Sequence, residues 1–178
     1  MNKISRYVNA VPAFLDKPRF NINTVRRLRQ QLTYRTINEW EARGLISPHR
    51  TTKSVGWRKF SAMDIIRLFV ISDLKTFGFS NGEITKILSR ISPNRGQDRY
   101  TSRSLDNCVG ESLSSKTRFL LFILERTTPR FIKETDDWKD ILLHGKTYKH
   151  PTVILPVADY IVKLSDGNIL CAEAKQKV

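Results

Sequence analysis

The sequence of 178 residues lacks a long hydrophobic run and contains only two cysteines, Cys108 and Cys171. A membrane protein is not expected, because a membrane-spanning helix needs ~20 consecutive apolar residues. The N-terminal segment is interrupted by Asn and Pro, which is atypical of a signal peptide. The two cysteines lie far apart without flanking metal ligands, so neither a disulfide framework nor a zinc site is expected. A reducing cytoplasm is the simplest location.

The side-chain combinations of common catalytic and metal sites are also lacking. None of the three histidines, His49, His144 and His150, is followed three or four residues later by a side chain that would complete a convincing ligand pair. No Ser/His/Asp arrangement, phosphate-binding glycine-rich loop or carboxylate pair stands out. We therefore expect no metal, no cofactor and no enzymatic activity.

Acidic residues are scarce in the first third of the chain. The formal net charge is +14, and residues 1–60 contain 13 Lys or Arg against 3 Asp or Glu, a net charge of +10. Residues 61–99 contain 6 Lys or Arg against 4 Asp or Glu, and residues 100–178 contain 12 Lys or Arg against 10 Asp or Glu, so each segment has a net charge of +2. Positive charge concentrated in this way indicates a surface that faces nucleic acid. A membrane surface is not expected, because no basic amphipathic helix with a broad apolar face is present.

Residues 32–60 carry the most informative pattern, which begins with a short predicted helix. Thr33 is suited to cap this helix, because its hydroxyl can accept hydrogen bonds from first-turn amides. Ile37 and Trp40 recur at helical spacing and predict its buried side. Gly44 suits the left-handed position just after a helix end. The exposed positions of the first turns, where a recognition helix meets base edges, are Tyr34, Arg35 and Asn38.

A basic and aromatic hairpin is predicted after this helix. Four cationic residues surround Gly56 and Trp57, namely Arg50, Lys53, Arg58 and Lys59. We expect Arg58 to point outward toward a phosphate, because its aromatic neighbours would anchor the strand. The indole of Trp57 either packs on the hairpin or donates to a phosphate oxygen. A helix followed by such a hairpin is typical of a helix-turn-helix with a wing.

Residues 20–31 predict the first helix of the same unit, capped by Asn23 or Thr24. Its apolar stripe consists of Ile22, Val25, Leu28 and Leu32. Three arginines would point outward and either form a solvated face or meet phosphates: Arg26, Arg27 and Arg29.

Two further helices are predicted downstream, each beginning with a capping box. Ser61 and Asp64 open one helix, which Gly78 ends. Ser80 and Glu83 open the next. The predicted core positions are Ile65, Ile66, Leu68, Phe69, Ile71 and Leu74 in the first helix, and Ile84, Ile87, Leu88 and Ile91 in the second.

In this order, residues 20–91 resemble the winged-helix DNA-binding domain of the MerR family of bacterial transcription regulators. The matching pieces are Phe20-Asn21-Ile22, Arg35-Thr36-Ile37, Glu41-x-x-Gly44-Leu45-Ile46, Gly56-Trp57-Arg58-Lys59-Phe60, Ser61-x-x-Asp64-Ile65 and Leu74-Lys75-x-x-Gly78-Phe79-Ser80-x-x-Glu83-Ile84. Each piece is weak alone, but six pieces in register over about 70 residues form a specific signal.

The resemblance implies that the second helix enters the major groove of duplex DNA while the wing holds the backbone. It implies that Trp57 and Arg58 hold phosphates and that Thr33, Tyr34 and Arg35 lie near bases. Arg35 either reads guanine or holds a phosphate. The chain departs from the family's Arg-aromatic-Tyr-Glu pattern with Asn38-Glu39-Trp40-Glu41, so the target sequence does not carry over.

The remainder of the chain shows no defensible resemblance. The family commonly continues into a long dimerisation helix, which residues 92–104 interrupt as a linker. Residues 113–126 are a predicted apolar helix that would form either a core or a dimer contact. A short helix at residues 135–144 follows, then strands at residues 152–164 and 169–174 joined by a turn at residues 165–168.

The predicted fold is mainly α, with an N-terminal winged helix-turn-helix and a small α+β C-terminal domain. The predicted parts are an N-terminal extension (1–19), the winged domain (20–91), a linker (92–104) and the C-terminal domain (105–178). The expected DNA-binding residues are Arg26, Arg27, Thr33, Tyr34, Arg35, Asn38, Arg50, Lys53, Trp57, Arg58 and Lys59.

These features predict a sequence-specific duplex-DNA-binding transcriptional regulator associated with a bacterial nucleoid. The alternative is an architectural or excisionase-like recombination-accessory protein that bends DNA, and structured RNA is a third candidate ligand. The C-terminal domain could form a homodimer, contact a protein partner or bind a small effector.

Overall fold

The computed structural model describes residues 13–50, 58–92, 104–134 and 153–166. The helices are α1 (Ala13–Asp16), α2 (Ile22–Leu28), α3 (Tyr34–Ala42), α4 (Ala62–Thr76), α5 (Asn81–Ile91), α6 (Leu105–Ser115) and α8 (Val157–Asp166). The strands are β1 (His49–Arg50), β2 (Arg58–Lys59), β3 (Phe119–Leu124), β4 (Thr128–Lys133) and β5 (Val153–Pro156).

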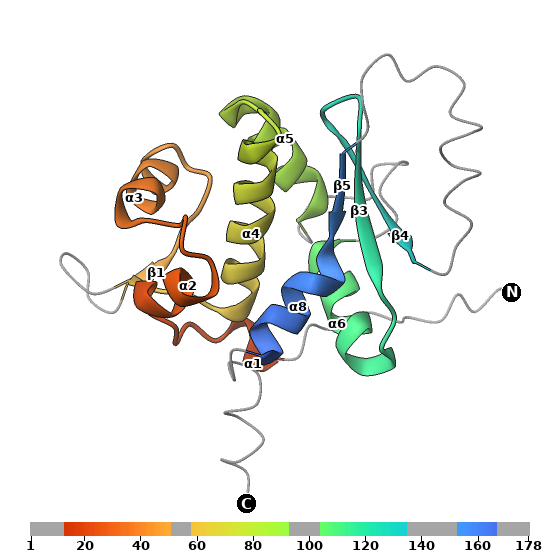
Figure 1. Cartoon of the computed structure of the whole chain (residues 1–178), viewed down its shortest axis with the longest axis horizontal. Coiled ribbons are helices and arrows are strands. Elements are labelled where there is room, and N and C mark those ends of the chain that lie inside the picture. Colours follow the sequence, from red (N-terminus) through yellow and green to blue (C-terminus); the bar gives the residue numbers. More distant parts are fainter. Residues whose placement is uncertain (1–12, 51–57, 93–103, 135–152, 167–178) are drawn as a thin grey trace, which may run out of the picture.

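The long helix α4 lies at the centre of the molecule (Figure 1). On one side of α4 lie α2, α3 and the antiparallel pair of β1 and β2, and on the other stands an antiparallel sheet in the order β4-β3-β5. The helices α6 and α8 lie near the lower end of this sheet. The predicted fold class, a mainly helical N-terminal region followed by a small α+β part, is confirmed.

Side chains at the helix starts cap the first-turn amides much as the sequence predicts. Ser61 and Asp64 form the predicted capping box of α4, with hydrogen bonds of 2.9 and 3.0 Å. Ser80 and Glu83 form the equivalent box of α5. The predicted cap of α2 was wrong, because Asn21 rather than Asn23 or Thr24 precedes the helix and accepts from the Thr24 amide at 3.0 Å. A start at this point brings the buried Ile22 into the helix.

Two helices end on the glycines that were predicted to end them, and both glycines are left-handed, which was predicted for Gly44. Gly44 follows α3 with φ +68°, and the two hydrogen bonds of a Schellman motif join its amide to Glu41 and the Leu45 amide to Trp40. Gly78 follows α4 with φ +77° and closes the same motif. A side chain at either glycine would strain the backbone, because residues with a Cβ rarely adopt this region.

The larger of two hydrophobic clusters among the described residues extends from Leu15 in α1 to Leu164 in α8. The predicted core residues of α4 are buried, as are Ile84, Ile87 and Ile91 of α5, while Leu88 is only half-buried. Backbone hydrogen bonds between Phe20 and Phe60, 2.9 and 2.8 Å long, join the start of the helix-turn-helix to the end of the hairpin. Described elements from both halves of the sequence therefore share one core.

The last residues of the predicted N-terminal extension pack against the core. Leu15 is 1% exposed and belongs to the core cluster, and α1 contacts α4. Residues 1–12 lie outside the described residues.

The helix predicted at residues 113–126 was wrong. These residues contain the end of α6 and the strand β3, whose six residues all pair with β4 and whose residues 120–123 also pair with β5. Phe119 and residues 121–124 are fully buried, so the interpretation of this segment as core is confirmed. A continuous apolar run of strand length fits a central strand packed on both faces, which periodicity alone does not distinguish from a buried helix.

The strand predicted at residues 152–164 was half wrong, because β5 ends at Pro156 and α8 follows directly. The buried residues of α8 recur at helical spacing: Val157, Tyr160, Ile161 and Leu164. Ser165 and Asp166, expected in a turn, continue the helix. The predicted helix at residues 135–144 and the strand at residues 169–174 lie outside the described residues, as does nearly all of the predicted linker.

No helix in the described part of the chain is long and apolar enough to cross a membrane.

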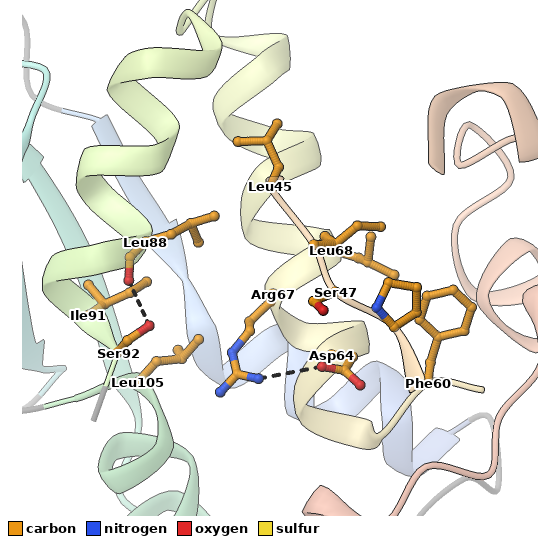
Figure 2. A pocket seen from close by; sticks show the side chains of 12 residues that line it. Leu45, Ser47, Phe60, Asp64, Arg67, Leu68, Leu88, Ile91, Ser92 and Leu105 are labelled. Atoms are coloured by element: carbon orange, nitrogen blue, oxygen red, sulfur yellow. Dashed lines mark hydrogen bonds and ion pairs between the residues drawn. The ribbon is translucent and has the colours of Figure 1, made fainter. Parts of the chain in front are cut away.

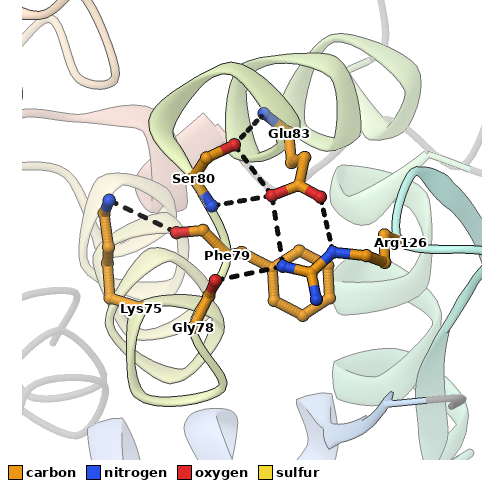
Figure 3. A network of polar contacts seen from close by, with 6 residues as sticks. All are labelled: Lys75, Gly78, Phe79, Ser80, Glu83 and Arg126. Atoms are coloured by element: carbon orange, nitrogen blue, oxygen red, sulfur yellow. Dashed lines mark hydrogen bonds and ion pairs between the residues drawn. The ribbon is translucent and has the colours of Figure 1, made fainter. Parts of the chain in front are cut away.

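A polar clamp attaches the β3–β4 turn to the start of α5 (Figure 3). The guanidinium of Arg126 donates to the carboxylate of Glu83 at 2.5 and 3.3 Å and to the Gly78 carbonyl at 3.0 Å. It also stacks over the ring of Phe79, 4.7 Å from the centroid. Hydrogen bonds from Arg126, and then from the amide and hydroxyl of Ser80, lower the pKa of Glu83 from 4.5 to about 2.

We expect Glu83→Gln to lower the melting temperature at neutral pH by roughly 3–6 °C. A hydrogen bond to a charged group contributes about 1.5 kcal/mol at the low end of its range, which suits this partly exposed pair, and 1 kcal/mol corresponds to ~2–4 °C in a chain of this length. Because the folded pKa of Glu83 is depressed, its stabilisation is complete above about pH 4.5 and disappears as the pH falls toward about 2. Thermal melts of both proteins should therefore converge on acidification, and a constant difference down to pH 2 would contradict this assignment.

Candidate nucleic-acid interface

The helix α3 buries one side and exposes its N-terminal turns. Ile37 is fully buried and Trp40 is 5% exposed, so these two residues anchor the helix to the core. Tyr34 is 43% exposed, and Arg35 and Asn38 are exposed beside it. These three side chains are therefore accessible to a partner, as the sequence predicts.

The Thr33 side chain caps this helix. Its hydroxyl accepts from the Thr36 amide at 3.2 Å and lies 2.9 Å from the Thr36 hydroxyl. The predicted cap is thus confirmed. Thr33 is also exposed at the start of the helix, beside the accessible turns.

The arginines of the α2 region fall into two groups. Arg26 and Arg27 are exposed in the last turn of α2, as expected for a cationic surface. The expectation that Arg29 points outward was wrong. Its guanidinium pairs with the Asp73 carboxylate of α4 and donates to the Phe69 carbonyl at 2.9 Å, and its side chain is only 14% exposed. Arg29 lies just past the helix, where extended backbone turns it toward α4.

The hairpin that follows α3 is confirmed at its base. The strands β1 and β2 are antiparallel, and His49 pairs with Lys59 and Arg50 with Arg58. His49 is exposed, and Lys59 is half-buried. Lys53 and Trp57 lie outside the described residues.

The prediction that Arg58 points outward was wrong. Its guanidinium forms an ion pair with Glu41 at 2.6 Å and donates to the Asn38 side-chain carbonyl, and both partners belong to α3. The side chains of Arg58 and Glu41 are only 22% and 20% exposed. This contact fixes the base of the hairpin against α3. The signal in the sequence that could have predicted this pair was the presence of an acidic residue in the predicted helix and a basic residue in the predicted hairpin.

Glu39, the acidic residue on the accessible part of α3, also has a cationic partner. Arg43 lies one turn later and pairs with it at 3.0 Å, with about half of each side chain exposed. An exposed pair of this kind contributes little to stability, but it offsets the negative charge of Glu39 locally.

A separate pocket of about 340 Å³ lies between the α3–β1 connection, α4, α5 and the start of α6 (Figure 2). Most of its lining residues are apolar, and the charged ones are Asp64 and Arg67. The guanidinium of Arg67 contacts Asp64 at 3.5 Å and Asp106 at 2.9 Å. Burial raises the pKa of Asp106, against the opposing effect of Arg67. This contact also joins α4 to α6.

Within the described ranges, no three His, Cys, Asp or Glu side chains come together where they could hold a metal ion. Cys108 is buried in α6, and Cys171 lies beyond the described residues.

The comparisons with known proteins yield one finding. A family model described as MerR HTH family regulatory protein matches residues 20–91. No curated protein and no solved structure matches the chain. The matched segment begins at Phe20, which bridges to Phe60, and ends with the last residue of α5. It therefore contains α2, α3, the two hairpin strands, α4 and α5. Residues 20–91 therefore form a helix-turn-helix domain of the MerR family of DNA-binding regulators.

Proposed function

We propose that the chain is a sequence-specific transcriptional regulator that inserts α3 into the major groove of duplex DNA and rests its hairpin on the backbone. The observation that carries this proposal is the accessibility of Tyr34, Arg35 and Asn38 on a helix whose opposite side is locked into the core. Exposed side chains in the first turns of a recognition helix are those that reach base edges. A rigidly held helix presents them with little loss of conformational freedom.

Arg35 is the best candidate for reading a base. A guanidinium can donate two hydrogen bonds to O6 and N7 of guanine, which discriminates against other bases by about 1–3 kcal/mol. Arg35 is exposed near the start of α3. Tyr34 and Asn38 flank it. Thr33 caps the N-terminus of α3, where the free backbone amides of the first turn favour a phosphate.

Phosphates would be held by the cations around α3. These are Arg26 and Arg27 of α2, Arg50 and Lys59 at the base of the hairpin, and Lys53 between them in the sequence, and the neutral indole of Trp57 would add an N–H donor to a phosphate oxygen. Such contacts position the protein without reading sequence. We assign Arg58 a different role, since its pairing with Glu41 and Asn38 supports a residue that sets the angle between hairpin and helix.

The alternative is an architectural or recombination-accessory protein that bends DNA. One observation favours it, because the described residues after α5 contain the 11-residue α6 and the strand β3 rather than a long dimerisation helix. A homodimer, a protein partner or a small effector acting through the C-terminal part also stays a proposal.

Selection of bound fragments from a random duplex library, run beside a light-scattering mass, tests the proposed function. Two spaced half-sites and a dimeric mass are expected of a regulator of this family. A single short site with a monomeric mass would favour the accessory role. Retention of structured RNA in preference to duplex DNA would contradict both roles.

Substitution of single arginines should separate base reading from phosphate binding. We expect Arg35→Ala to weaken binding to the selected site by about 1–3 kcal/mol and to leave non-specific binding nearly unchanged. Arg26→Ala and Arg27→Ala should weaken binding to every sequence, and each should reduce the salt slope by about 0.9 if it removes one phosphate interaction. Titrations at several salt concentrations measure both effects, and a uniform loss for all three variants would exclude base reading by Arg35.

The role of Arg58 can be tested with its partner. If Arg58 positions the hairpin, Arg58→Ala and Glu41→Gln should each weaken DNA binding, and the double variant should be little worse than either. A coupling energy of about 0.5–3 kcal/mol is expected for residues in direct contact. Lys133→Ala, which breaks the ion pair between β4 and Glu111 of α6 at 3.0 Å, is the matched control and should change affinity little, because this pair lies outside the proposed DNA interface. Additive losses with a lower salt slope for Arg58→Ala alone would instead identify a phosphate contact.

A further inference from the structure

The C-terminal helix α8 reaches the DNA-facing helix α2 through one carboxylate of α4. The hydroxyl of Tyr160 in α8 donates to Oδ2 of Asp73 at 2.5 Å. The guanidinium of Arg29, which follows α2, pairs with Oδ1 of the same carboxylate. Asp73 therefore joins two elements that lie far apart in the sequence.

Phe69, one turn before Asp73, completes this contact. The guanidinium of Arg29 lies over its ring at 5.3 Å from the centroid and donates to its carbonyl at 2.9 Å. The ring of Tyr160 meets the same ring edge to face at 5.8 Å. Arg29 and Tyr160 thus share two neighbours on α4, and a shift of either residue disturbs the other.

The polar groups of this site depend on one another because water reaches them poorly. The side chains of Arg29 and Asp73 are 14% and 20% exposed, and Tyr160 is 3% exposed. Burial and the neighbouring Asp73 charge raise the pKa of Tyr160, so its hydroxyl stays protonated and donates. Without that donor, one oxygen of a poorly solvated carboxylate would be left without a partner, which is costly.

Arg29 is well placed to transmit this contact to the DNA interface. Its backbone amide donates to the Val25 carbonyl at 3.0 Å and so closes the last turn of α2. The exposed Arg26 and Arg27 belong to that same turn. The contact of the Arg29 side chain with α4 therefore fixes the position of Arg26 and Arg27.

We propose that Tyr160, Asp73 and Arg29 are positioning residues of the DNA interface, through which α8 sets the affinity for DNA. This inference rests on the proposed function, because it concerns the strength of the same DNA contact. A ligand or partner that displaces α8 would change DNA affinity, and DNA would change the affinity for that ligand by the same factor. The C-terminal part would then control DNA binding directly through the core.

The clamp between Glu83 and Arg126 supplies a matched control (Figure 3). It also attaches the C-terminal part to the helices of the MerR-type domain, but it ends on α5 and the α4–α5 turn. The hydrogen bonds of the clamp therefore bypass α2 and α3. Removal of this clamp should reduce stability without changing the position of Arg26 and Arg27.

The test compares the full-length chain with Tyr160→Phe, Asp73→Asn and Glu83→Gln. Affinity for the selected duplex and the melting temperature are measured for each protein, with binding followed at a temperature well below every melting transition. We expect Tyr160→Phe and Asp73→Asn to bind DNA at least about 5-fold more weakly, the lower end of ordinary coupling between sites. Glu83→Gln should bind like the parent despite its lower melting temperature.

Amide hydrogen exchange provides a second measurement. Tyr160→Phe should speed exchange in α2, and Glu83→Gln should speed it at the start of α5. Parent-like affinity and α2 exchange in a folded Tyr160→Phe would overturn the inference while leaving the proposed function intact. An equal loss of affinity in Glu83→Gln would also overturn it, since general destabilisation would then explain both results. Failure of the parent chain to bind any duplex would overturn the proposed function itself, and this inference with it.

Discussion

The burial of α4 on nearly all of its sides is the constraint on which the described structure depends. Ten of its fifteen residues are buried, and a helix that is apolar around its circumference must be surrounded by other elements. The helix-turn-helix covers one side, and α8 and the C-terminal sheet with α5 stand on others. One helix therefore supports both the helix-turn-helix and the C-terminal part, so the two halves of the sequence are energetically linked.

On the side that we propose faces DNA, some cations are held in ion pairs and others are exposed. Arg29 and Arg58 are turned onto acidic partners and fix α2 and the hairpin relative to α4 and α3. Arg26, Arg27 and Arg35 are exposed next to these anchors. The positive charge of the first 60 residues thus divides into cations that build the interface and cations that we propose to meet DNA.

Much of the N-terminal fold could be predicted from sequence because its signals are local. Capping boxes at Ser61 and Ser80, and a glycine after each of two helices, specify boundaries within a few residues. The directions of Arg29 and Arg58 could not be predicted in this way, because their acidic partners lie far along the chain and only packing brings them together. Asp73 is 44 residues from Arg29 and 87 from Tyr160.

The C-terminal part was harder to predict for a different reason. A short apolar run such as β3 fits a central strand or a buried helix equally well, and its two neighbours in the sheet decide between them. The buried residues of α8 show helical spacing in the sequence. The apolar residues of β5 directly precede them, however, and the two segments together were interpreted as one strand. The site residues themselves remain predictions, since exposure makes Tyr34, Arg35 and Asn38 available without identifying their partner.

Photo-cross-linking to a selected duplex tests the central claim most directly. A cross-linking side chain at position 35, in the first turn of α3, would be compared with one at position 162, which is 51% exposed on α8. The account predicts cross-links from position 35 to bases through the major groove and none from position 162. Cross-links from position 162 alone, or the absence of cross-links from position 35 to bases in the major groove, would contradict it.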